Sequence, residues 1–283
     1  MKILILGSTG ILGGTLSLFL NQKKNITIHF ISRSKKNKAH IYLKDFTDFN
    51  KLKNIILEIK PTHIINCVGI TKYNNSYKVK TLTKLINTKL PQYLSNMCLR
   101  NKIFFLHIST DCVFSGKKGN YTDKSKKDAL DTYGVSKSKG EVKNEYTTTI
   151  RTSFIGPEQN SKKSLLNWFL SKKREVNGFN NAFFSGLTSL EISQIIFKYF
   201  LKNKILYNKI INVGGNTISK YDLLSNIAKI FNKKILIKKF TDFKIDRSLN
   251  CQKFKKISKY KNKSWLKMLR ELKIFMIDNN YKY

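Results

Sequence analysis

Residues 2–13 are Lys2-Ile3-Leu4-Ile5-Leu6-Gly7-Ser8-Thr9-Gly10-Ile11-Leu12-Gly13, an apolar run followed by three glycines spaced three apart. The run is typical of a buried parallel strand, and residues 11–20 have the apolar spacing of a helix. Gly7 permits a tight turn, Gly10 lets backbone approach a pyrophosphate, and Gly13 lets the helix pack close to the sheet. The free N–H groups at the start of the helix would face the anion. This stretch predicts a dinucleotide-binding turn.

Strands and helices alternate from residue 1 to about residue 155. Further strands are predicted at 26–31, 64–68, 103–108 and 149–154. Helices are predicted at 49–59, 82–99 and 133–146, and Pro91 should break or kink the second of them. The alternation predicts an α/β fold of the Rossmann type, in which residues 1–155 form a doubly wound parallel sheet that binds NADP.

Residues 156–283 are less regular and predict a smaller, mainly substrate-binding lobe. Helices are expected at 165–170, 190–201 and 221–231, the last with Ser219 as its N-cap. A strand near 208–214 ends in two glycines and is expected to return to the first sheet. We therefore expect the two parts to be interleaved rather than joined by a linker.

The formal net charge of +37 invites a nucleic-acid partner, but the type of basic residue argues against a specific one. Only six of the 54 basic residues are arginine, the preferred residue for reading bases. The remaining lysines are spread along the chain, beside abundant asparagine and isoleucine, as in proteins of AT-rich genomes. We interpret them as solvated surface positions that help to attract an anionic substrate.

Other features indicate a cytoplasmic enzyme without a metal. No apolar run approaches the roughly 18 residues that span a bilayer, and the first twenty residues lack the pattern of a signal peptide. The four cysteines lie far apart, as expected of reduced thiols. The four histidines show no ligand spacing, and three of them, His107 included, lie in strands as packed or hydrogen-bonded residues. The oligomeric state is left open, a homodimer included.

The end of the second strand predicts the cofactor. An acidic residue there would bind the ribose of NADH, but this chain has Ser32 and Arg33, which suit a 2′-phosphate. NADPH is therefore favoured, with NADH as the alternative. Asp45 and Phe46 are expected near the adenine. The other expected cofactor contacts come from the glycine turn and from the end of the third strand: Thr9, Ile11, Leu12, Cys67, Val68 and Gly69.

A hydroxyl and a Tyr-x-x-x-Lys pair predict the catalytic group. Thr110 ends the strand at 103–108, and Tyr133 and Lys137 share one face of a helix. Tyrosine, with a pKa near 10, is a sluggish acid at neutral pH. An ammonium about 4 Å away would stabilise its phenolate by up to roughly 4 kcal/mol at an effective dielectric near 20. Thr110 would hydrogen-bond the reacting oxygen.

These motifs resemble those of the extended short-chain dehydrogenase/reductase superfamily and, more narrowly, of the dTDP-4-dehydrorhamnose reductase family. The strand-end motif is Ser109-Thr110-Asp111-Cys112-Val113-Phe114-Ser115-Gly116, with Cys112 where the family has an aromatic residue. The helix motif is Tyr133-Gly134, Lys137 and Gly140-Glu141. Residues 178–188 and 246–250 also resemble the family, the former a sub-branch found with nucleotide-sugar genes.

The resemblance implies reduction, in deoxysugar biosynthesis, of a 4-keto-6-deoxy sugar carried on a nucleotide diphosphate. Tyr133 would protonate the nascent alkoxide, Lys137 would tune Tyr133 and hold the nicotinamide ribose, and Asn87 would support the lysine. Ser109 joins the expected cofactor contacts. The expected substrate contacts are Asp111, Val113, Phe114 and Arg247, the last on the diphosphate. The sub-branch favours a UDP-linked 2-acetamido-2,6-dideoxy-4-keto sugar.

Three alternatives stay open. A nucleotide-sugar epimerase or dehydratase would use the same scaffold, although a dehydratase usually has a carboxylate pair beside the threonine, and Cys112 follows Asp111 here. A non-catalytic, NADP-binding regulatory subunit often lacks the tyrosine or the lysine, and both are present. A reductase-like nucleic-acid-binding protein is suggested by charge alone.

Overall fold

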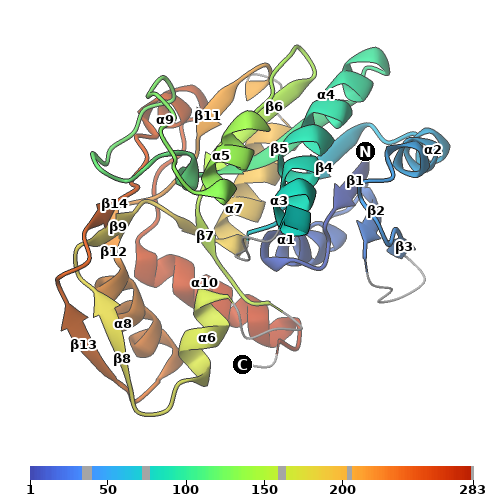
Figure 1. Ribbon diagram of the computed structural model, residues 1–283. Coiled ribbons are helices and arrows are strands. Elements are labelled where there is room, and N and C mark those ends of the chain that lie inside the picture. The colour runs from blue at the N-terminus through green and yellow to red at the C-terminus, as the bar shows by residue number, and fades with distance from the viewer. Residues whose placement is uncertain (34–39, 72–76, 159–163, 203–205, 282–283) are drawn as a thin grey trace.

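A seven-stranded parallel sheet forms the centre of the computed structural model, which describes residues 1–33, 40–71, 77–158, 164–202 and 206–281 (Figure 1). Its strands, in chain order, are β1 (Lys2–Leu6), β2 (Thr27–Ser32), β3 (His40–Tyr42), β4 (His63–Asn66), β5 (Phe104–Thr110), β6 (Thr147–Thr152) and β11 (Ile210–Asn212). Their order across the sheet is β11-β6-β5-β4-β1-β2-β3. The order reverses between β1 and β4, the point where such sheets bind ligands at the carboxyl ends of their strands. The Rossmann-type prediction is confirmed.

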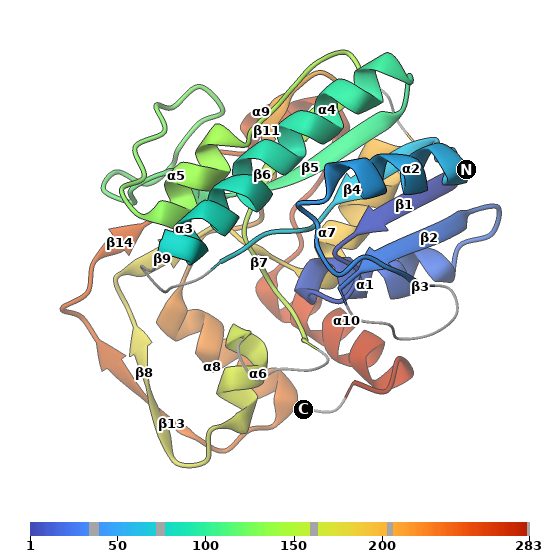
Figure 2. The same cartoon turned by 45° about the vertical axis from the view of Figure 1, so that its right-hand side comes forward.

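Alternate residues of β1 build the two faces of the sheet, since successive side chains of a strand point to opposite sides. Ile3 and Ile5 pack in one apolar cluster with α1 (Ile11–Asn21) and α7 (Ser189–Ile195). Leu4 and Leu6 pack in another with α2 (Phe49–Ile59) and α4 (Leu90–Arg100). α3 (Tyr77–Lys84) and α5 (Thr132–Lys139) lie on the α4 side (Figure 2).

The helix predicted at 82–99 differs from expectation at Pro91. The helical path runs from α3 through a π-helical turn, η1 (Leu85–Lys89), into α4, with Pro91 in the first turn of α4. A π turn is wider than an α turn, so it accommodates the proline ring and the missing N–H without ending the helix. Of the predicted break or kink, the break is absent, and the π turn that precedes Pro91 carries Asn87.

The helix predicted at 133–146 is shorter than expected. α5 ends at Lys139, and the next residues turn towards β6 instead of continuing the helix. Glu141 therefore lies outside the helix, and its side chain is buried. Helices at 49–59 and 220–231 agree with prediction, and Ser219 caps the latter, α8 (Lys220–Phe231), through the N–H of Asp222.

The later residues form the smaller lobe beside the carboxyl ends of the strands (Figure 2). β11 lies parallel to β6 in the main sheet, so the chain returns to that sheet after residue 200. The helices of the lobe, apart from α8, are α6 (Leu165–Ser171) and α10 (Trp265–Asp278), whereas α9 (Gln252–Ser258) lies beside β11 of the main sheet (Figure 1). The strands of the lobe are β8 (Glu175–Phe179), β9 (Ala182–Phe184), β12 (Ile218–Ser219), β13 (Leu236–Phe240) and β14 (Ile245–Asp246). Among the described residues, none of these helices is long and apolar enough to cross a bilayer.

Candidate active site

The glycine turn leaves the start of α1 open to a ligand. Gly7 has φ +81°, and a Cβ on Gly13 would collide with the carbonyl oxygen of Gly7. No side chain caps α1 at Gly10, whereas α2, α5, α6, α7, α8 and α10 each have a capping side chain. The first N–H groups of α1 therefore suit a ligand anion, as expected of a dinucleotide phosphate.

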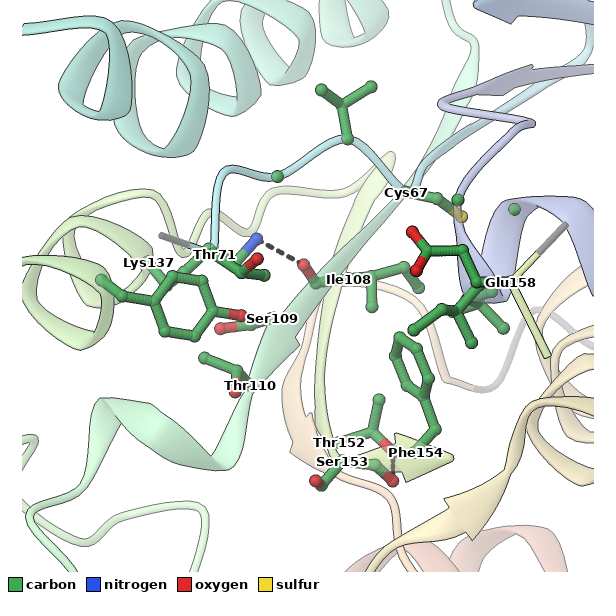
Figure 3. Close-up of a pocket in the computed structure, with 17 residues that line it drawn as sticks. Cys67, Thr71, Ile108, Ser109, Thr110, Lys137, Thr152, Ser153, Phe154 and Glu158 are labelled. Carbon is green, nitrogen blue, oxygen red and sulfur yellow. Dashed lines mark hydrogen bonds between the residues drawn. The ribbon is translucent and has the colours of Figure 1, made fainter. Parts of the chain in front are cut away.

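A cavity of about 360 Å³ runs from this turn across the ends of the strands (Figure 3). Predicted residues of four segments line it: Gly10, Ile11, Leu12, Cys67, Val68, Gly69, Ser109, Thr110, Tyr133 and Lys137. Figure 3 shows Ser109 and Thr110 at the end of β5, with Lys137 reaching the carbonyl of Ile108. The structure thus brings the expected catalytic residues to one cavity with most of the expected cofactor contacts.

A second cavity, of about 690 Å³, adjoins the first. The two share Thr71, Thr110, Tyr133, Ser153 and Phe154 in their walls. The second reaches Asp111, Cys112 and Arg247, on the side of the smaller lobe. Thr110 and Tyr133 therefore lie where a ligand in the first cavity would meet a ligand in the second.

The hydroxyl of Thr110 is already engaged. Its Oγ1 donates to Asp111 Oδ1 at 3.1 Å and accepts from the N–H of Cys112 at 3.1 Å. Burial raises the pKa of Asp111, and the charges of Lys220 and Arg247 oppose that rise. Because a hydroxyl has one proton to donate, Thr110 can bind a carbonyl oxygen only by giving up its bond to Asp111.

Lys137 is buried, with 3% of its surface exposed. Its Nζ donates to the carbonyl oxygen of Ile108 at 2.6 Å and lies 3.3 Å from Nε2 of His107. Burial lowers the pKa of Lys137 to about 8, against the opposing effects of Glu141 and Cys67. The lysine therefore changes charge near the pH at which proteins work.

A buried ion pair supports the end of β5. Arg151 donates Nε to Glu141 Oε1 at 2.7 Å and Nη2 to Oε2 at 2.9 Å, and Ser109 Oγ donates to the same carboxylate at 2.9 Å. Burial alone would raise the pKa of Glu141, but Arg151, Lys127 and Ser109 bring it below its ordinary value. The pair ties β5 and β6 to the segment after α5.

Arg247 is held at the wall of the second cavity by backbone and side-chain contacts. Nε donates to the carbonyl of Phe114 at 3.2 Å, Nη1 lies 3.3 Å from Cys112 Sγ, and Nη2 lies 3.8 Å from Asp131 Oδ2. Its side chain keeps about a quarter of its surface exposed, so it can still meet an anion in the cavity.

Val113 and Phe114 are not where the strand-end motif placed them. Both have no exposed surface and pack in a separate apolar cluster with Tyr121, Leu249 and Cys251. The reason is the 3-10 turn at Asp111–Val113, which directs these side chains below the cavity. The expected substrate contact is therefore wrong for them, and Phe114 instead holds Arg247 through its carbonyl.

Several predicted cofactor residues lie outside the walls of the first cavity. The ring of Phe46 packs in the core, so only the backbone of this residue could contact an adenine. The carboxylate of Asp45 accepts from the N–H and the hydroxyl of Thr47. Ser32 is buried at the end of β2, and Arg33 beside it is exposed.

Asn87 does not contact Lys137 directly through any hydrogen bond that the structure describes. Its amide accepts from the N–H of Ile70 at 2.9 Å and donates to the carbonyl of Ile70 and to Ser136 Oγ. It thereby fixes the loop after β4 against α5, which positions the cavity wall at residues 69–71.

Sequence reasoning missed six residues in the walls of the first cavity: Thr71, Ile108, Thr152, Ser153, Phe154 and Glu158. Ser153 and Phe154 follow the end of β6, and that position was their only signal, because parallel strands end at the same edge of a sheet.

The fold and this site define an NADP-type oxidoreductase of the extended short-chain dehydrogenase/reductase class, with a threonine and a tyrosine at the junction of two cavities and a lysine in the wall of the first. The family model described as RmlD substrate binding domain matches residues 1–180, and the chain belongs to this family.

Relatives agree with this assignment. The chain is 27% identical over 233 residues to a dTDP-4-dehydrorhamnose reductase of Aggregatibacter actinomycetemcomitans, an alignment that spans 78% of this chain and 76% of the relative. A hypothetical dTDP-4-dehydrorhamnose reductase of Sulfolobus tokodaii is similar in structure, with 25% identity, a TM-score of 0.76 and coverage of 91% and 94%. The dTDP-4-dehydrorhamnose reductase of Bacillus anthracis, solved in complex with NADP, shares the fold at 19% identity, with a TM-score of 0.82 and coverage of 96% and 97%.

Proposed function

We propose that this chain is an NADPH-dependent reductase that acts on the 4-keto group of a 6-deoxy sugar carried on a nucleotide diphosphate, in deoxysugar or polysaccharide biosynthesis. One observation carries the proposal. Thr110 and Tyr133 lie in the walls of both cavities, so a cofactor in the first and a keto sugar in the second would meet at a hydroxyl and a phenol. The names of the relatives support the same reaction.

The residues of the first cavity fit a nicotinamide dinucleotide. The uncapped start of α1 suits the pyrophosphate, and Gly10 has space around it where a side chain would stand. Arg33, at the end of β2, suits the 2′-phosphate that distinguishes NADPH. When bound, NADPH supplies the hydride for reduction at C4.

The chain's own residues then handle the proton. Tyr133 donates its phenolic proton to the oxygen at C4, and the ammonium of Lys137 stabilises the phenolate that forms. Thr110 turns its hydroxyl from Asp111 to the same oxygen and so orients it. The carbonyl of Ile108 holds Lys137 in place throughout.

Arg247 supports an anionic substrate in the second cavity. The guanidinium is anchored by Phe114 and Asp131 and borders the cavity, as does Lys80. A diphosphate between two such cations would be bound by charge-assisted hydrogen bonds. We favour a UDP-linked 2-acetamido-2,6-dideoxy-4-keto sugar over a dTDP-linked one, and place the reaction in the cytoplasm.

The test is NADPH oxidation with nucleotide-linked 4-keto-6-deoxy sugars, followed by the loss of NADPH absorbance. UDP-linked and dTDP-linked forms, with and without the 2-acetamido group, are compared as substrates. We expect turnover with at least one form and a product reduced at C4. NADPH binding without turnover of any of them would contradict the proposal and favour the regulatory-subunit alternative.

Tyr133→Phe should lower kcat by roughly 10²–10⁴-fold, because it removes the proton donor and leaves the ring in place. NADPH binding, measured by cofactor fluorescence, should be unchanged within a factor of about two. A variant that keeps more than about a tenth of the wild-type kcat would show that another group donates the proton.

A further inference from the structure

Lys137 is the end of a buried chain of three polar side chains. Its Nζ lies 3.3 Å from Nε2 of His107, and Nδ1 of the same ring lies 3.2 Å from Nδ2 of Asn66. His107 is on β5 and Asn66 ends the neighbouring β4, and neither has any exposed surface. None of the three roles assigned to the site above uses His107 or Asn66.

The backbone fixes which way the amide of Asn66 faces. The N–H of Val68 donates to Asn66 Oδ1 at 3.0 Å, and a backbone N–H can only donate. The oxygen of the amide is therefore on that side, and the NH₂ group faces Nδ1 of His107 and donates to it. Nδ1 must then carry a lone pair.

The proton of His107 therefore belongs on Nε2. Burial, together with the charge of Lys137, lowers the pKa of His107 well below its ordinary value, so the ring is neutral and has one N–H. With Nδ1 as the acceptor, the N–H is on Nε2 and points at Nζ of Lys137.

This N–H distinguishes the two charge states of the lysine. An ammonium has three donors and no acceptor, so the charged form opposes a donor to a donor. A neutral amine has a lone pair that accepts from Nε2–H. The carbonyl of Ile108 accepts from Nζ in either state, so it does not discriminate between them.

We propose that Asn66 fixes His107 as the Nε2–H tautomer, and that this N–H favours the neutral amine of Lys137. Asn66 and His107 are thus positioning residues, which act through the lysine on the pH at which it loses its charge. The other titratable groups that face Lys137 are Cys67 after β4, Glu141 after α5, and Tyr133 on its own helix. Glu141 favours the charged form of Lys137, so the effect of Asn66 and His107 on the pKa of Lys137 opposes that of Glu141.

The first test needs no substrate. In protein labelled with ¹⁵N-histidine, the chain gives signals from only four imidazoles, and His107→Phe identifies the one in question. We expect a neutral ring protonated at Nε2 from about pH 6 to about pH 8. A ring protonated at Nδ1, or a charged ring at neutral pH, would overturn the proposal.

The second test reverses the tautomer and rests on the proposed function. In Asn66→Asp the carboxylate has only acceptors, so His107 carries its proton on Nδ1 and donates it in a hydrogen bond to that carboxylate. The lone pair on Nε2 is then free to accept from the ammonium of Lys137. The fall in kcat at high pH should then move to higher pH by roughly one unit.

The negative charge that Asn66→Asp adds could by itself raise the pH at which kcat falls. Making the same change in His107→Phe separates this effect of charge from the effect of the tautomer. In His107→Phe, the further change Asn66→Asp should move the pH profile by much less than in the presence of the imidazole. An equal shift in both backgrounds would overturn the relay through His107. If no sugar is turned over, the proposed function fails while the imidazole signal still decides the tautomer.

Discussion

Lys137 becomes almost inaccessible to water on folding, and this burial governs its acid–base behaviour. Its ordinary pKa of 10.5 falls to about 8, because burial penalises the charged form more than Glu141 and Cys67 favour it. A lysine with this pKa is a charge that a change of pH near neutrality can remove.

The activity should follow that charge. Below about pH 8 Lys137 carries the proton with which, in the proposed mechanism, it stabilises the phenolate of Tyr133, and above that pH the charge is lost. We expect kcat at saturating NADPH and substrate to fall as the pH rises through about 8. Circular dichroism over the same range separates this effect from unfolding. A kcat that stays flat well above this pH would contradict the assignment of the ammonium.

Cofactor choice should depend on Arg33. Removing a charge-assisted contact to the 2′-phosphate costs on the order of 1.5–3 kcal/mol, so Arg33→Ala should weaken NADPH binding by about tenfold or more. NADH binding should barely change. Lys44→Ala removes another exposed cation nearby and is the matched control. Equal losses for NADPH and NADH would show that Arg33 does not bind that phosphate.

At the residue scale, the sequence predicted those site residues whose positions follow from the regular spacing of a helix or a strand. Tyr133 and Lys137 are one helical turn apart, and Thr110 ends a strand, so their meeting at one cavity follows from regular structure. Val113 and Phe114 lie in a turn without a repeating direction, and their burial could not be derived. His107 alternates with Ile108 on β5, but nothing in the sequence indicates that it faces Lys137.

At the scale of elements, helices that follow a regular pattern could be predicted, and irregular turns and helix ends could not. The amphipathic spacing of α2 predicts its bounds, since its buried face repeats along the helix. The course through Pro91 could not be derived, because a π turn inserts one residue without a sequence signal of its own. The early end of α5 leaves Glu141 free to pair with Arg151 on β6. This contact joins two separate segments, so the pattern of residues along the helix does not predict it.

The pair of Glu141 and Arg151 should make a large contribution to stability. Glu141→Gln leaves the guanidinium of Arg151 buried without its countercharge, which typically costs about 3–5 kcal/mol of the free energy of unfolding. Urea denaturation of the two proteins measures the loss.

An exposed pair of similar length provides the control. Lys238 and Glu175 also meet at 2.7 Å, but each keeps about half of its side-chain surface exposed. Glu175→Gln should therefore change the free energy of unfolding by less than about 1 kcal/mol. Equal losses in the two variants would show that the burial of Glu141 does not strengthen its contribution.

For the whole molecule, the parallel sheet and the helices α6 and α8 of the small lobe could be predicted, but the strands of the lobe could not. β1 is an apolar run after Lys2, and β4 and β5 have apolar residues at half or more of their positions, as expected of strands covered on both faces. In the lobe, β8 pairs with β13 more than 50 residues later, and β12 and β14 have two residues each. Such short strands are defined by their partners rather than by their own composition.

The net charge of +37 is a property of the whole surface and should give only non-specific binding to nucleic acid. Fluorescence anisotropy with labelled DNA should show binding that falls steeply with salt, because each phosphate contact releases counterions. At about 0.15 M salt, DNA should neither compete with NADPH nor alter turnover. Tight, sequence-dependent binding at that salt would promote the nucleic-acid alternative.

The place of β11 also affects how the protein is made on the ribosome. β6 ends at Thr152, but its outer neighbour is complete only at Asn212, and Arg247 follows 95 residues after Thr152. At roughly 5–20 residues per second, translation needs about 3–12 seconds to cover the 60 residues from Thr152 to Asn212. During this interval the nascent chain exposes the edge of β6, a surface on which another unfinished chain can pair. Both the rate of translation and the protection of that edge by chaperones therefore affect how much of the protein reaches its active form.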